Sequence, residues 1–115
     1  MQKTIKNKIN ISGKGLHTGI HTDITLLPSS INTGIRFRRV DLTHKPYIDA
    51  LIENVCETNR RTVIKKDDAV VETVEHILAA VSMSSINNLI IEINGPEIPI
   101  LDGSSKIFME KIEEA

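Results

Sequence analysis

Apolar and polar residues alternate along most of the first seventy positions, which is the pattern of strands that bury one face. The predicted strands cover residues 3–11, 20–27, 34–40, 48–55 and 62–71. The Ser-Gly-Lys-Gly run at 12–15 predicts a loop after the first strand, and the last segment reads as a hairpin that turns at 66–68. In the third strand Ile35, Phe37 and Arg39 share one face.

The hydrophobic period lengthens in the second half of the chain, which predicts helices there. Apolar residues at spacings i, i+3, i+4 and i+7 define a helix at 73–83, with Thr73 as its candidate N-cap. The remaining elements are a strand and a second helix, at 88–94 and 104–114. Asp102 and Ser104 are the candidate caps of that helix. Because most strands precede the helices, the expected fold class is α+β: a two-layer sandwich with the two main helices on one face of a mostly antiparallel sheet.

Composition and charge indicate a small sheet-rich globular domain and disfavour a nucleic-acid-binding protein. Ile, Val and Thr supply 35 of the 115 residues, and this β-branched share favours sheet. A 40% hydrophobic content at this length predicts that residues 1–115 form a single domain. Lys and Arg number 14 against 15 Asp and Glu, so the formal charge of −1 disfavours nucleic acid as a partner.

The cysteine count and the hydropathy bear on where the protein works. Cys56 is the single cysteine, so it forms no internal disulfide and is expected to be a small core hydrophobe. No apolar run is long enough to predict a transmembrane segment. These features predict a cytoplasmic protein.

Glu75 and His76 are the strongest candidates for chemistry, because they are adjacent in the first turn of the predicted helix. A neutral imidazole can bind Zn2+, and a carboxylate about 100° around the helix could take a proton from the metal's water. Taken by itself, the pair has a simpler interpretation that is the stronger one. An acidic residue there usually interacts with the helix dipole, and a lone histidine is commonly structural.

Other candidate sites are weaker. His17 and His21 have the i, i+4 spacing of a helical metal pair, but in a strand-rich segment they would stand about 13 Å apart, so we exclude them as a two-ligand site. Arg60 and Arg61 precede a strand and could meet a phosphate, although a solvated pair is the more ordinary interpretation.

Three ordered motifs resemble the N-terminal domain of the zinc-dependent UDP-3-O-acyl-N-acetylglucosamine deacetylase family of lipid A biosynthesis. They are the Gly-Lys-Gly-Leu-His-Thr-Gly run at 13–19, the Thr-Val-Glu-His-Ile-Leu-Ala-Ala run at 73–80, and the Asn-Gly-Pro-Glu-Ile-Pro-Ile-Leu-Asp-Gly-Ser run at 94–104. The resemblance extends over essentially the whole chain but over less than half of the family's length. Residues 54–63 are reminiscent of members that are fused to a hydroxyacyl-carrier-protein dehydratase.

The resemblance implies roles for individual residues. Glu75 matches the general base that activates a zinc-bound water for attack on the substrate's acetamide, and His76 matches the one zinc ligand that this half supplies. Leu16 and His17 match a loop that borders the active site. A strand edge that lines the cleft is matched by four further candidate substrate-binding residues, namely Thr58, Arg60, Arg61 and Thr62.

Two parts of the match stay open. Arg60 and Arg61 depart from the side chains associated with better-known members. Asp102 lies in the third motif, where helix capping and an active-site role are both compatible with its position.

The rest of the active site is absent from this chain. The resemblance implies that the remaining His and Asp ligands lie in a His-Lys-x-x-Asp motif of a second domain, which also holds the histidine that acts as general acid. The chain is therefore expected to be the N-terminal half without its C-terminal domain, and to be inactive alone. A face of mostly small residues on the first helix is expected to meet that domain: Thr73, His76, Ala79, Ala80 and Met83.

The leading hypothesis is the N-terminal domain of a zinc-dependent deacetylase that acts on UDP-3-O-(3-hydroxyacyl)-N-acetylglucosamine. The alternative is a non-catalytic module that binds a nucleotide or a protein through the loop at Leu16 and His17 and the edge at Arg60 and Arg61. A purely structural domain is a third reading.

Overall fold

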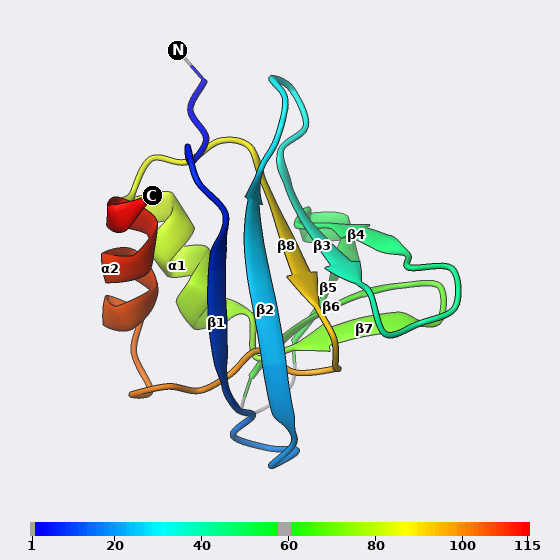
Figure 1. Ribbon diagram of the computed structural model, residues 1–115. Helices are drawn as coiled ribbons and strands as arrows, with labels where there is room; N and C mark the ends of the chain where they lie inside the picture. Colours follow the sequence, from blue (N-terminus) through cyan, green and yellow to red (C-terminus); the bar gives the residue numbers. More distant parts are fainter. Residues whose placement is uncertain (1, 58–60) are drawn as a thin grey trace.

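A mixed sheet forms the centre of the protein. The computed structural model describes residues 2–57 and 61–115, and within them this sheet has five strands. Their spatial order is β1 (Ile9–Lys14), β2 (His21–Pro28), β8 (Leu89–Ile93), β3 (Ile35–Arg39) and β4 (Tyr47–Asp49) (Figure 1). Neighbouring strands are antiparallel except β3 and β8, which run parallel.

One face of this sheet is buried and the other is polar. In the sheet's register Ile91 lies between Leu26 and Phe37, and Ile48 follows on the far side of Phe37. The helices α1 (Glu75–Met83) and α2 (Lys106–Glu114) contact each other and lie on the same side of the sheet (Figure 1). The core joins this sheet face to side chains of the helices: Ile77, Ala80, Val81, Phe108 and Ile112. The prediction of an α+β fold is confirmed, and the predicted alternation of β3 holds, since Phe37 and Arg39 are both buried.

A smaller antiparallel sheet supports the start of α1. It consists of β5 (Val55–Glu57), β6 (Thr62–Lys66) and β7 (Ala69–Glu72), and β6 and β7 form the predicted hairpin. The single strand predicted at 48–55 is wrong. It divides into β4, a 3-10 turn η1 (Ile52–Asn54) and β5, because the Asn54 side-chain amide donates to the Asp49 carbonyl (2.8 Å) and closes a turn there.

The first strand is shifted from its prediction. β1 begins at Ile9 and continues through the Ser-Gly-Lys run to Lys14, so the predicted loop at 12–15 is wrong in its first three residues. Pairing of Gly13 with Thr22 and of Lys14 with His21 keeps this part in the sheet. Glycine at 13 here permits close approach rather than a break, because a Cβ would lie 3.0 Å from the Cβ of Pro99.

The predicted helix ends also need correction. α1 begins two residues after Thr73, its N-cap is Val74, and no side chain caps it. The N-cap of α2 is Ser105, also without a capping side-chain bond. Ser104 accepts a bond from Lys106 N (3.2 Å), whereas Asp102 accepts bonds from Ser104 and not from the helix.

Two burial predictions are wrong. Cys56 is exposed and is not a core residue, because in β5 the neighbouring Val55 packs against the core and the next side chain along a strand points to the other face. Ala80 is fully buried because it lies on the core side of α1, and Thr73 is nearly buried because it precedes the helix and bonds to the buried Glu97, so neither is part of an open helix face. Ala79 and Met83 are exposed, and His76 is partly so. No helix in the described ranges has the length and apolar character needed to cross a membrane.

The buried side chain of Arg39 links the two sheets. Its Nε and Nη2 donate to the two Asp41 oxygens (2.9 and 2.7 Å), and its Nη1 donates to the Val70 carbonyl of β7 (2.7 Å). The hydrogen bond from Arg39 holds the pKa of Asp41 below its ordinary value of 3.8.

Replacing Asp41 with Asn is expected to lower the free energy of unfolding by about 1.5–3 kcal/mol at pH 7, since the buried guanidinium loses its charged partner. The folded-state pKa of Asp41 is lowered, so its stabilising effect is present above pH 3.8 and is lost as the pH falls through the folded value. Urea denaturation at a series of pH values measures this difference. Asp68→Asn, in the exposed β6–β7 turn, is the matched control, and a difference that stays constant down to about pH 2 would contradict the prediction.

Candidate functional site

Glu75 and His76 occupy the first turn of α1, where the chain leaves the smaller sheet and enters the helix. Both side chains are partly buried. Glu75 Oε1 accepts a hydrogen bond from the backbone N–H of Thr62 at the start of β6 (3.2 Å). The structure therefore brings together three predicted site residues, because the β6–β7 hairpin returns the chain to the edge where α1 begins.

The loop between β1 and β2 carries Leu16 and His17. Bonds from Gly15 N to the Ile20 carbonyl (3.0 Å) and from Gly19 N to the Gly15 carbonyl (3.1 Å) close it. The Leu16 side chain is 60% exposed, and His17 is exposed as well. Figure 1 shows this loop at the end of the molecule where α1 starts.

Glu97, which the sequence analysis did not single out, connects that loop to the region before α1. Its carboxylate accepts bonds from the hydroxyl of Thr73 (2.5 Å) and from the backbone N–H groups of Thr18 (2.8 Å) and His17 (3.1 Å). Burial by itself raises the pKa of Glu97, but the bonds from Thr73, Thr18 and His17 bring its pKa below the ordinary value. The available signal was a carboxylate inside the otherwise apolar run at 96–101.

The other residues predicted for the site have fewer described contacts with Glu75 and His76. Arg61 Nε lies 2.6 Å from Glu72 Oε1, so this guanidinium has a carboxylate partner. Thr58 and Arg60 lie outside the described residues. Asp102 is exposed, and the hydrogen bond from the Ser104 hydroxyl lowers its pKa.

The described ranges, 2–57 and 61–115, contain no group of three or more His, Cys, Asp or Glu side chains that could hold a metal ion. His76 in the first turn of α1 fits the role of one ligand, and a catalytic zinc ordinarily takes three from protein. The described residues thus fit part of a zinc site and not a complete one.

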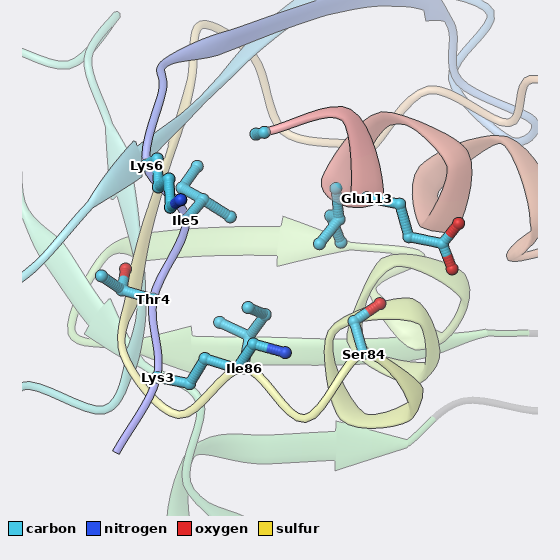
Figure 2. A pocket seen from close by; sticks show the side chains of 9 residues that line it. Lys3, Thr4, Ile5, Lys6, Ser84, Ile86 and Glu113 are labelled. Atoms are coloured by element: carbon cyan, nitrogen blue, oxygen red, sulfur yellow. The ribbon is translucent and has the colours of Figure 1, made fainter. Parts of the chain in front are cut away.

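A pocket lies away from these residues, at the opposite end of α1. It has a volume of about 360 Å³, and its lining includes Lys3, Ile5, Ser84 and Glu113 (Figure 2). Ser84 is the C-cap of α1, whereas Glu75 opens the helix, so this pocket is not part of the candidate site.

Sequence comparison decides the family. The profile of the family described as UDP-3-O-acyl N-acetylglycosamine deacetylase matches residues 2–115. The chain belongs to this deacetylase family. The resemblance expected from the three motifs is therefore confirmed.

Deacetylases of this family with similar sequences are much longer. The bifunctional enzyme LpxC/FabZ of Bacteroides thetaiotaomicron is 47% identical over 112 residues, which are 97% of this chain and 24% of that protein. The UDP-3-O-acyl-N-acetylglucosamine deacetylases of Geotalea uraniireducens and Chlamydia felis are both 46% identical over 114 residues, 99% of this chain and 37% and 40% of theirs. The chain thus spans about a quarter to two-fifths of these relatives. Since both bifunctional and single-function deacetylases match, fusion to a dehydratase stays a prediction.

Proposed function

We propose that this chain is the N-terminal domain of a zinc-dependent hydrolase that removes the acetyl group from UDP-3-O-(3-hydroxyacyl)-N-acetylglucosamine in lipid A biosynthesis. The observation that carries the proposal is the adjacent carboxylate and imidazole in the first turn of α1, in a chain that belongs to the deacetylase family. The coverage of the relatives supports a second domain beyond these residues, and we expect the piece alone to be inactive.

Zinc enters the proposal through His76, which would supply one ligand, with the others coming from the second domain. A bound zinc ion would lower the pKa of a coordinated water and polarise the carbonyl of the substrate. Because His76 and Glu75 are consecutive, their side chains leave the helix about 100° apart, so the carboxylate can stand beside the metal site without being a ligand.

The residues of this chain have different roles in the proposed reaction. Glu75 takes the proton of the attacking water, and the Thr62 N–H bond to its Oε1 holds the carboxylate in place. His17 and the exposed Leu16 form one edge of the site at the β1–β2 loop. Thr58, Arg60, Arg61 and Thr62 remain proposed contacts of the substrate. A cytoplasmic location is part of this proposal, because a single cysteine forms no internal disulfide and the fold therefore needs no oxidising compartment.

The first test of the proposal is zinc binding by the full-length enzyme. Loss of a residue that only supports a metal ligand typically weakens metal binding by about 10- to 100-fold. His76→Ala removes a proposed ligand itself, so we expect it to weaken zinc binding by more than that. Metal content by elemental analysis after dialysis measures this loss. His44→Ala, at an exposed position in the loop before β4, is the control.

Full zinc retention by the His76→Ala enzyme would contradict the assignment of this ligand.

Calorimetry with UDP separates the proposed deacetylase from the alternative, a non-catalytic binding module. Binding that is unchanged by a chelator and by Glu75→Gln, in an enzyme without deacetylase activity, would favour the module.

A further inference from the structure

Glu97 is a fully buried carboxylate that the proposed reaction does not use. Its backbone is fixed to the end of β7, because Glu72 N donates to the Pro96 carbonyl (2.7 Å) and Ile98 N donates to the Glu72 carbonyl (3.1 Å). The side chain therefore starts from a rigid position next to α1. A buried carboxylate is costly unless hydrogen bonds compensate for its lost hydration, so the stability of this arrangement depends on the donors around Glu97.

Those donors come from two segments far apart in the sequence. The β1–β2 loop provides the backbone N–H groups of His17 and Thr18, and the segment before α1 provides the hydroxyl of Thr73. One carboxylate thus accepts bonds from both sides of the candidate site.

Gly15 shows how closely the loop and the carboxylate fit. A Cβ built on Gly15 would overlap Oε1 of Glu97 and would lie 2.7 Å from its Cδ. Any side chain at this position would push the carboxylate away from the loop. Glycine is therefore required here by the approach of Glu97.

Thr73 shows strain on the other side of the carboxylate. Its φ is +60°, a left-handed conformation that is a genuine outlier for a β-branched residue. Residues held in this region are strained, and they persist only where surrounding contacts fix them. The bond from its hydroxyl to Glu97 is such a contact, and Thr73 lies two residues before Glu75.

We propose that Glu97 is a positioning residue that fixes the His17 loop relative to the first turn of α1. Through it, the edge formed by Leu16 and His17 keeps a set distance from Glu75 and His76. The consequence for catalysis rests on the proposed function, whereas the ordering of the loop does not.

The first experiment measures the loop without reference to activity. Amide hydrogen exchange is followed in the full-length protein and in its Glu97→Ala and Glu97→Gln variants. The amides of His17 and Thr18 are expected to lose protection in the alanine variant and to keep most of it in the glutamine variant. Glutamine retains an acceptor for these N–H groups, and its amide can donate to the Thr73 hydroxyl. Unchanged exchange at both amides in Glu97→Ala would overturn the proposal.

The second experiment measures catalysis. Glu97→Ala is expected to lower kcat/KM for deacetylation by about 10- to 100-fold with zinc content unchanged, and Glu97→Gln to recover activity to within about tenfold of the parent. The matched control is Glu92→Gln, which alters a carboxylate on the opposite, polar face of the sheet.

A double-mutant cycle separates positioning from a general effect on stability. In a His17→Ala background, the proposal predicts that Glu97→Ala adds less than in the parent, because both changes act on one loop. Fully additive losses would overturn the catalytic part. If Glu97→Ala does not fold, Thr73→Val replaces it, since it removes one donor and keeps the side-chain shape. A parent enzyme without deacetylase activity would count against the proposed function alone, and the exchange result would still decide the role of Glu97.

Discussion

Glu75→Gln is expected to lower kcat for the proposed deacetylation by the full-length protein by about 10²- to 10⁴-fold, the range that a positioned general base contributes. The amide of glutamine cannot take a proton from the attacking water. It can still accept the Thr62 N–H bond that Glu75 Oε1 accepts now, so the local fold should persist. Steady-state kinetics measures the loss, and elemental analysis should show the same zinc content as in the parent.

Glu110→Gln is the control for Glu75→Gln, because it makes the same chemical change at an exposed position on α2. A Glu75→Gln enzyme with a near-normal rate would remove Glu75 from the mechanism. Loss of zinc together with loss of rate would instead mean that Glu75 supports the metal site.

Phe37→Ala is expected to have the largest effect on stability, lowering the free energy of unfolding by about 3–5 kcal/mol. Phe37 is fully buried and lies between Ile91 of β8 and Ile48 of β4 in the sheet. Its removal would leave a cavity under the centre of the sheet, where a rigid backbone limits collapse. A domain of this size is stable by only about 5–15 kcal/mol.

Urea denaturation measures the effect of Phe37→Ala. Ile31→Ala is the matched control, because the Ile31 side chain is 69% exposed and should change stability by no more than about 0.5 kcal/mol. Equal stabilities of the two variants would mean that Phe37 does not belong to the core.

The elements with strong periodicity were predictable from the sequence. The stripe around Ile77 and Val81 predicted α1, and the alternation of Ile35, Phe37 and Arg39 predicted β3 and the shared face of these side chains, two of which are buried. These patterns work because burial of one face is the main force that selects each element.

The parts that failed depend on contacts between distant residues. Thr73 was predicted as a helix cap because its side chain has a suitable oxygen. In the structure its hydroxyl donates a hydrogen bond to Glu97 instead, and α1 starts two residues later. Gly13 looked like a strand break, although pairing with Thr22 and the approach of Pro99 keep it in β1. No local pattern contains these partners.

The candidate site also contains residues that local sequence patterns indicate and one that depends on a distant contact. Glu75, His76 and the loop at His17 followed from motifs that can be read along the chain. Glu97 did not, because its partner His17 is 80 positions away in the sequence and only the fold brings the two residues together.

The central place of β8 has a consequence for synthesis on the ribosome. β8 lies between β2 and β3 in the sheet, but along the chain it begins at Leu89, whereas β2 ends at Pro28 and β3 at Arg39. The β1–β2 and β3–β4 hairpins can each form early. They cannot join into one sheet, however, until residues 89–93 have emerged from the ribosome and form β8 between them. The nascent polypeptide must therefore keep two unfinished hairpins apart from other chains until the closing strand arrives, and that interval is when aggregation is the main hazard.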